Sequence, residues 1–177
     1  MKDVRTIALV GLAALMVAVL ACSKGPQPPK DIQYFPCDNM DGVQTPDLVT
    51  FDPSVSADGK GSLKITADQP TTVALFDVPF PGAEGSSLIY KAKVKTKDFG
   101  GDAYLQMVVH FANGGSLSTM NYQKAIGGTT GWVDMETSTV IQAGQKPDAV
   151  KLNLVANGQG TVWIDDVHLV RAPKPGS

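Results

Sequence analysis

Two adjacent aspartates near the carboxyl end of the chain are the first residues whose type and spacing could do chemistry. Asp165 and Asp166 interrupt an alternating apolar run, in which Val162 and Ile164 share one face and the alternation resumes at Val167. Because side chains alternate with a period of two along a strand, this slip of one residue predicts a β-bulge at the two aspartates. Two carboxylates at a bulge serve either turn and hydrogen-bond chemistry or the binding of a hard cation through oxygen ligands.

A second candidate group lies on one face of an expected strand over residues 104–111. Its polar face holds Tyr104, Gln106 and His110, whereas the opposite face is apolar. A sugar-binding face needs a ring plane for stacking and polar groups that bond to hydroxyls, and these side chains supply both. Further side chains can join them if their segments lie alongside: Tyr122 in the connection over residues 113–130, and Lys151 and Asn153 in an expected strand over residues 149–156. The alternative for each is structural, as padding of a sheet edge or as a solvated side chain.

The sequence contains no constellation that predicts catalysis. His110 and His168 are the only histidines, and neither a G-x-S-x-G elbow nor a phosphate-binding loop is present. Glycoside hydrolysis needs two acids that flank a cleft, which the adjacent Asp165 and Asp166 do not provide. Asp134 and Glu136 share a strand face, but such pairs are common on solvated strands. We therefore expect a non-catalytic domain.

The amino terminus has the parts of a secretory signal. Lys2 and Arg5 precede an apolar run over residues 6–20, which is short for a membrane span. The segment Val19-Leu20-Ala21-Cys22 resembles the lipobox of bacterial lipoproteins. That resemblance implies cleavage before Cys22, lipid such as palmitate on Cys22, and a domain tethered to the cell envelope. An ordinary signal peptide and an uncleaved anchor are the alternatives.

The residue after Cys22 bears on which membrane is expected. Ser23 stands where inner-membrane lipoproteins of enteric bacteria carry a retaining aspartate, so the outer membrane is favoured if the source has one. We expect a signal peptide over residues 1–21, the lipidated cysteine and a proline-rich linker over 22–30, one domain over 31–171 and a tail over 172–177.

Composition narrows the classes of partner. The chain has 15 Lys and Arg against 17 Asp and Glu, for a net charge of −2. This balance argues against a nucleic-acid surface and against a polybasic membrane-binding face. With Cys22 carrying lipid, Cys37 is left alone and is expected to be a buried thiol, with intermolecular pairing as the alternative. No disulfide framework or zinc site is expected, and we expect a monomer whose partner is a glycan or an envelope protein.

Short β-rich runs punctuated by turn residues predict an all-β protein with two stacked antiparallel sheets. The strands are expected over residues 63–66, 73–78, 88–96, 104–111, 132–141, 149–156 and 161–170. The connecting turns are expected at Asn113-Gly114-Gly115, Gly127-Gly128 and Asn157-Gly158. Nothing in the pattern orders the strands within the sheets.

Three segments carry a resemblance to a known superfamily. They are GKGSLKI at residues 59–65, GGTTGW at residues 127–132 and GTVWIDDVHL at residues 160–169. In this order and spacing they resemble the galactose-binding-like β-jelly roll of carbohydrate-binding modules, as grouped in families four and nine. The resemblance implies a two-sheet sandwich, with Trp132 and Trp163 packing structurally. None of the three segments is specific for a ligand, because the superfamily also has protein-binding and purely structural members.

The resemblance also implies a structural calcium ion. Members often hold one with an aspartate of the closing strand and oxygens of early loops, here Asp165, Asp166, Asp41 and Gly61. Solvated aspartates in a metal-free turn are the alternative. The leading functional hypothesis is non-catalytic glycan binding. The rival is a structural or protein-interaction lipoprotein that keeps the fold without a sugar site.

Overall fold

The computed structural model describes residues 28–175, and all strand pairings within them are antiparallel. The strands are β1 (Lys30–Phe35), β2 (Thr50–Asp52), β3 (Ser62–Ala67), β4 (Thr71–Pro79), β5 (Ser87–Phe111), β6 (Ser116–Met120), β7 (Ile126–Gly128), β8 (Val133–Val140) and β9 (Pro147–Ala172). Two single turns of 3-10 helix, η1 (Pro46–Leu48) and η2 (Tyr122–Lys124), complete the described elements. The predicted all-β fold is confirmed.

The amino-terminal predictions lie outside the described residues. They concern the signal peptide over residues 1–21 and the lipidated Cys22, and both stay predictions. Between residues 28 and 175, no helix is long and apolar enough to cross a membrane.

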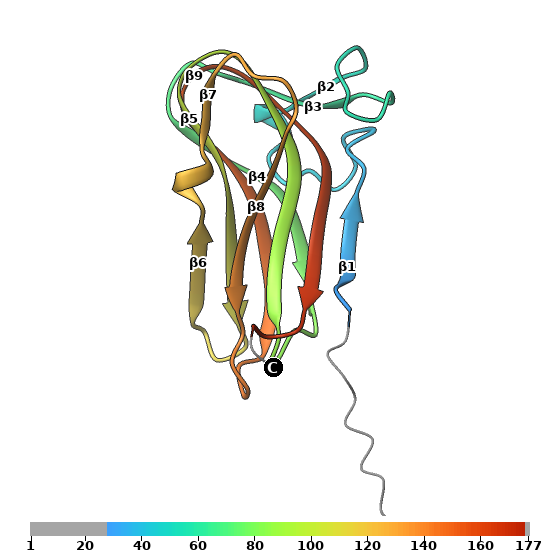
Figure 1. Ribbon diagram of the computed structural model, residues 1–177, viewed down its shortest axis with the longest axis vertical. Coiled ribbons are helices and arrows are strands. Elements are labelled where there is room, and N and C mark those ends of the chain that lie inside the picture. Colours follow the sequence, from blue (N-terminus) through green and yellow to red (C-terminus); the bar gives the residue numbers. More distant parts are fainter. Residues whose placement is uncertain (1–27, 176–177) are drawn as a thin grey trace, which may run out of the picture.

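Strands β5 and β9 each pass through both layers of the molecule. They pair over nearly their whole length, from Ser87 opposite Ala172 to Phe111 opposite Pro147. In Figure 1 they rise together, bend over at the top and descend. The sequence predicted two strands in place of each, with a turn at Asn157-Gly158, and this detail is wrong: both residues pair with β5 inside the continuous ladder. Gly127-Gly128 likewise belongs to a strand, β7, where Gly128 pairs with Phe99.

The bend depends on a close approach of two backbones. A Cβ at Gly158 would lie 2.6 Å from the carbonyl oxygen of Gly100 and 2.8 Å from the Cα of Gly101. Only glycine allows this contact, because real Cβ atoms do not come so near to backbone atoms. Asn157-Gly158 was predicted to be a hairpin turn. It instead lets the long ribbon of β5 and β9 fold onto itself.

Each half of the β5–β9 ribbon pairs with further strands and so forms one of the two layers. In the first layer β4 pairs with β9 over residues 149–156, and β6 pairs with β5 over residues 106–110. In the second layer β8 pairs with β5 over residues 87–94, while β1 and β3 pair with the last part of β9. The inner faces of both layers form one core, which includes Leu88, Tyr90, Val94, Leu105, Met107, Val109, Leu152 and Leu154. The outer faces therefore lie on opposite sides of the molecule.

The predicted β-bulge at the paired aspartates is confirmed. The register of β5 against β9 shifts between Lys91 and Lys93, opposite Asp165 and Asp166, and Asp166 has a φ of 54°. The free thiol of Cys37 is buried, as expected, and burial raises its pKa.

The two tryptophans fix the end of β2 and the connection that follows it to the sandwich. Trp163 is buried and donates from Nε1 to Asp52 Oδ2 at 3.0 Å. Trp132 is half-buried and donates from Nε1 to the Ser56 carbonyl at 2.9 Å. Their predicted structural role agrees with these contacts.

Candidate functional site

The polar residues predicted on two separate strands share one outward face of the first layer. Gln106 lies directly opposite Asn153 in the β5–β9 ladder, and Val108 lies opposite Lys151. Tyr104 and His110, each two residues from these pairs along β5, point the same way by alternation. We call the set Tyr104, Gln106, His110, Lys151 and Asn153 the polar face.

A chain of side-chain hydrogen bonds crosses three strands at the centre of the polar face. Asn153 Nδ2 donates to Gln106 Oε1 at 3.0 Å, and Gln106 Nε2 donates to the hydroxyl of Ser118 at 3.3 Å. Asn153 Oδ1 is buried and has no hydrogen-bond partner within the described part of the chain. Ser118 was not among the predicted residues, because the sequence placed residues 113–130 in a connection and missed β6. The alternation over Ser116-Leu117-Ser118 was the available signal.

Two tyrosines stand at one end of the polar face. The rings of Tyr104 and Tyr122 lie 4.5 Å apart between centroids at an interplanar angle of 59°. Tyr122, on η2, is 60% exposed, whereas Tyr104 is only 7% exposed. Burial, with Tyr122 beside it, raises the pKa of Tyr104 to about 12. The 113–130 connection thus reaches over this face through Tyr122, and the accessible aromatic surface belongs to Tyr122.

The other end of the polar face is sparsely charged. Lys151 Nζ lies 3.8 Å from Asp77 Oδ2 on β4, so its charge is balanced within the same layer. His110 is half-buried and lies between Ala149 and Ser116 in the ladders. The polar face therefore offers hydrogen-bonding groups and an aromatic ring, and the charge of Lys151 is balanced by Asp77.

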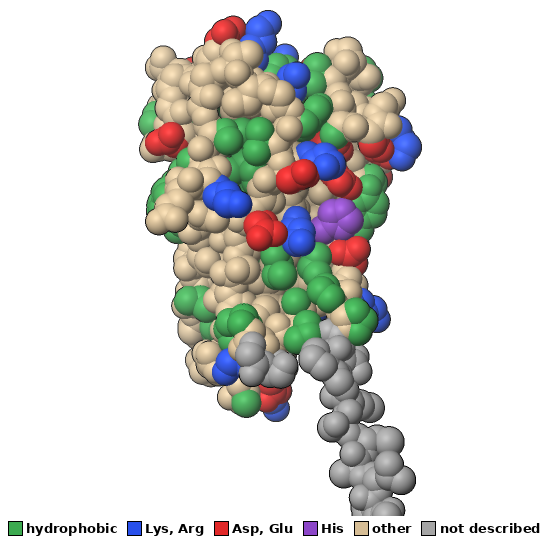
Figure 2. Space-filling view, in the orientation of Figure 1, with side chains coloured by type: hydrophobic (Ala, Val, Ile, Leu, Met, Phe, Trp, Pro, Cys, Tyr) green, Lys and Arg blue, Asp and Glu red, His purple; other side chains and the backbone are tan. Residues whose placement is uncertain are grey.

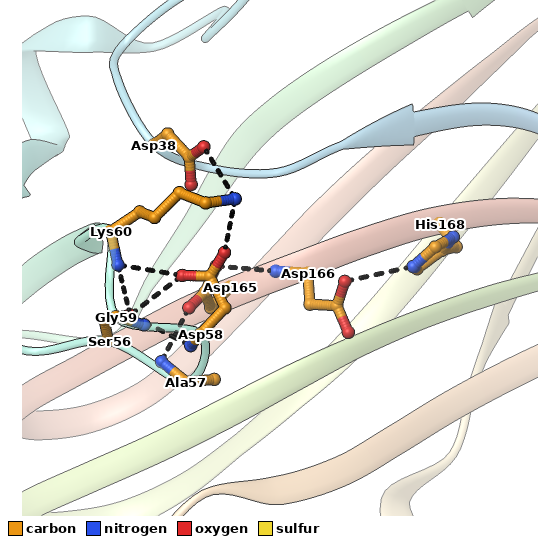
Figure 3. A network of polar contacts seen from close by, with 9 residues as sticks. All are labelled: Asp38, Ser56, Ala57, Asp58, Gly59, Lys60, Asp165, Asp166 and His168. Carbon is orange, nitrogen blue, oxygen red and sulfur yellow. Dashed lines mark hydrogen bonds and ion pairs between the residues drawn. The ribbon is translucent and has the colours of Figure 1, made fainter.

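The residues predicted to hold calcium do not assemble into a ligand set. Between residues 28 and 175, no three acidic, histidine or cysteine side chains come together as a metal site requires. Asp165 is 1% exposed, but its Oδ1 and Oδ2 each accept a 2.8 Å hydrogen bond, from the N–H groups of Asp166 and Ala57 (Figure 3). Asp166 turns to His168 instead, with 3.2 Å between Oδ1 and Nε2.

Asp41 and Gly61 each have a local structural role. Asp41 is exposed in a turn in which its N–H donates to Asn39. Gly61 backs onto the ring of Phe51, where a Cβ would lie 2.3 Å from Cζ. Within residues 28–175, the acidic side chains of the predicted set therefore do not converge on one point, as calcium ligands would.

Lys60, in the loop over residues 53–61, lies close to two aspartates. Lys60 Nζ lies 3.0 Å from Asp58 Oδ2 and 3.7 Å from Asp38 Oδ2 (Figure 3). Within the same loop Ser56 Oγ accepts hydrogen bonds from the N–H groups of Asp58 and Lys60, both at 3.0 Å. Lys60 thus places a positive charge beside the two aspartates, and backbone N–H groups of the loop donate to the Ser56 hydroxyl oxygen.

The outer face of the second layer has a different character. It contains a groove of about 460 Å³, and Figure 2 shows acidic and basic side chains and a histidine gathered across this side. Lys93 pairs with Asp134 at 2.7 Å and Lys91 with Glu136 at 3.6 Å. Asp134 and Glu136, noted in the sequence as a shared-face pair, thus take part in cross-strand ion pairs. We call this surface the charged groove.

The edge of the charged groove carries the second histidine. His168 Nδ1 lies 3.1 Å from Asp31 on β1, and Nε2 faces Asp166. The ring of Tyr34, which is 44% exposed, stacks on His168 with centroids 4.5 Å apart. These contacts hold β1 against β9.

No protein-family model matches the sequence, and comparison with curated proteins finds no relative. Among solved structures, the CBM22-1 xylan-binding domain from Paenibacillus barcinonensis Xyn10C aligns with 84% of this chain and 98% of its own, at a TM-score of 0.55 and 13% identity. The family 16 carbohydrate-binding module-2 aligns with 75% of this chain and 92% of its own, at 0.53 and 16%. TmCBM61, solved with β-1,4-galactotriose, aligns with 79% and 97%, at 0.53 and 14%.

These comparisons establish that the chain has the β-sandwich fold of carbohydrate-binding modules. At such low identity they show the fold alone, because one fold hosts many unrelated functions. The specific likeness to families four and nine stays a prediction.

Proposed function

We propose that this domain is a non-catalytic glycan-binding module and that the polar face is its binding surface. The observation that carries the proposal is the exposed ring of Tyr122 beside the hydrogen-bonded chain of Asn153, Gln106 and Ser118. An aromatic ring and adjacent fixed amides are the two elements that sugar recognition combines. Support also comes from the fold, which is shared with modules named for xylan binding and solved with a galactotriose.

A glycan array probed with the full-length protein, purified in mild detergent, tests the proposal. We expect binding to at least one glycan class, and loss of that binding in Tyr122→Ala. Tyr34→Ala is the matched control, because Tyr34 is also an exposed tyrosine but lies beside the charged groove on the opposite side. Equal loss in both variants, or binding that survives in Tyr122→Ala, would move the site away from the polar face. No binding on a broad array would remove the proposal.

The charged groove favours a second candidate function, a protein-interaction role. A groove of about 460 Å³ lined by both signs of charge suits a polar peptide surface better than an uncharged sugar. This candidate predicts a silent glycan array, together with a partner whose crosslinks to the full-length protein map to Lys91 and Lys93. Crosslinks that map elsewhere would remove it.

We also propose that Cys22 is lipidated and that the module is held in the cell envelope, at the outer membrane if the source has two membranes. The support is the lipobox-like segment and the proline-rich linker that follows it. In the native host, incorporation of an alkyne-labelled palmitate should occur in the wild type and be absent in Cys22→Ser. Fractionation of labelled cells would then assign the membrane, and label retained in Cys22→Ser would refute lipidation at this residue.

A further inference from the structure

The polar face contains a hydrogen-bond acceptor that the protein itself does not use. Asn153 is 8% exposed, and its Oδ1 has no partner within residues 28–175. Buried polar atoms in folded proteins are almost always paired, so an unpaired one requires an explanation. Its other amide atom, Nδ2, is already engaged by Gln106 Oε1. Oδ1 is therefore an unused acceptor at the centre of the face, and because it is itself covered, a ligand reaches it only when a neighbouring side chain moves.

We propose that Asn153 Oδ1 accepts a hydrogen bond from a hydroxyl group of the bound ligand, and that this ligand is an uncharged sugar. The inference rests on the proposed glycan-binding function and adds to it the chemical class of the ligand and the residue that selects it. An acceptor pairs with hydroxyl donors, and it repels the oxygens of carboxylates, sulfates and phosphates.

The charges around the acceptor point to the same class of ligand. The nearest cation in the ladder, Lys151, is balanced by Asp77 at 3.8 Å and is two residues from Asn153 on the same face. Tyr104 and Asn153, both more than nine-tenths buried, provide no counter-charge. An acidic sugar bound over them would lose its hydration without gaining a partner, which is costly for a charged group.

A tyrosine pair lies on the same face as the acceptor. Tyr104 is the diagonal neighbour of Asn153 across the ladder, since Gln106 is directly opposite and Tyr104 is two residues away on the same face. Tyr122 leans on Tyr104 from η2 and is itself 60% exposed. The exposed Tyr122 ring therefore offers the sugar an aromatic plane on the Tyr104 side of the face.

The test titrates full-length protein with three probes: xylohexaose, β-1,4-galactotriose and tetragalacturonate, the last as the acidic counterpart. We expect a neutral probe to bind, tetragalacturonate to bind at least about tenfold more weakly, and Asn153→Leu to weaken the neutral probe by at least about tenfold. Asn157→Leu, an exposed asparagine at the bend, is the control and should change affinity less than about twofold.

A second readout keeps the test valid if Asn153→Leu does not fold. In ¹⁵N-labelled wild-type protein, the side-chain amide resonances of Asn153 and Gln106 should shift on addition of the neutral probe. Neutral binding with unshifted resonances, or with full affinity in Asn153→Leu, would overturn the inference and leave the proposed function intact. A preference for tetragalacturonate would overturn the assignment of an uncharged ligand. Absence of binding to all three probes and to the glycan array would remove the proposed function and this inference together.

Discussion

The N–H of Ala57 donates to Asp165 Oδ2 at 2.8 Å, across a separation of 108 residues. This bond joins the loop over residues 53–61 to the bulge of β9. The other oxygen of the same carboxylate accepts from the N–H of Asp166, so one buried side chain satisfies two backbone donors. Asp165 thus serves hydrogen-bond chemistry at the bulge, which is the predicted alternative to cation binding.

Asp165→Asn should destabilise the protein by about 1–3 kcal/mol. The new NH₂ group cannot accept a hydrogen bond, so either Ala57 or Asp166 would face it with an unpaired N–H. Urea unfolding of the full-length protein measures the change. Asp134→Asn is the control, because the Asp134 side chain is 86% exposed and its ion pair lies at the surface. A loss of equal size in the two variants would contradict the role given to Asp165.

Gly158→Ala should cost about 2–3 kcal/mol, because its Cβ would overlap the backbone of β5 at the bend. Gly131→Ala provides the matched comparison, since a Cβ there meets no atom within 4 Å. We expect Gly131→Ala to change stability by less than about 0.5 kcal/mol. Thermal unfolding that ranks the two variants equally would mean that the ribbon bends without this close approach.

Ionisation of Tyr104 should weaken the fold at alkaline pH. Its pKa is raised to about 12, so the folded state retains the phenol proton after the unfolded chain has lost it near pH 10. Stability from this group is complete below pH 10 and is lost as the pH rises to 12, by about 2 kcal/mol. Between pH 9 and pH 11.5, the free energy of unfolding of Tyr104→Phe, measured by urea unfolding, should fall by less than that of the wild type. Identical losses in wild type and variant would show that another group is responsible.

Calcium should have no effect on the wild-type protein, because Lys60 already places an ammonium group between Asp58 and Asp38. We expect the melting temperature to be the same in millimolar calcium and in EDTA. Lys60→Met leaves the two carboxylates without this counter-charge and should make the melting temperature rise with calcium. Lys97→Met, an exposed lysine near the bend, should show no such response. A calcium-dependent rise in the wild type would contradict the assignment.

Alternation along the chain was sufficient to predict the class of fold and the two faces of its longest strands. The apolar set Leu105, Met107 and Val109 is buried, and Gln106 and His110 remain partly exposed on the other side. The slip at Asp165 and Asp166 located the bulge correctly. These predictions succeeded because a period of two depends only on the neighbouring residues in the chain.

Which residues are neighbours across the sheet could not be predicted without the tertiary structure. No local pattern shows that Asn157-Gly158 continues a ribbon, that Ser118 lies beside Gln106, or that Lys60 reaches Asp38. Each depends on pairing between segments far apart in sequence, and the register of such pairing is set by the packing of the whole core. The sequence by itself therefore determined which side chains face outward, whereas the tertiary structure decided which of them meet, because only the folded ribbon brings Asn153 next to Gln106 and leaves one of its oxygens unpaired.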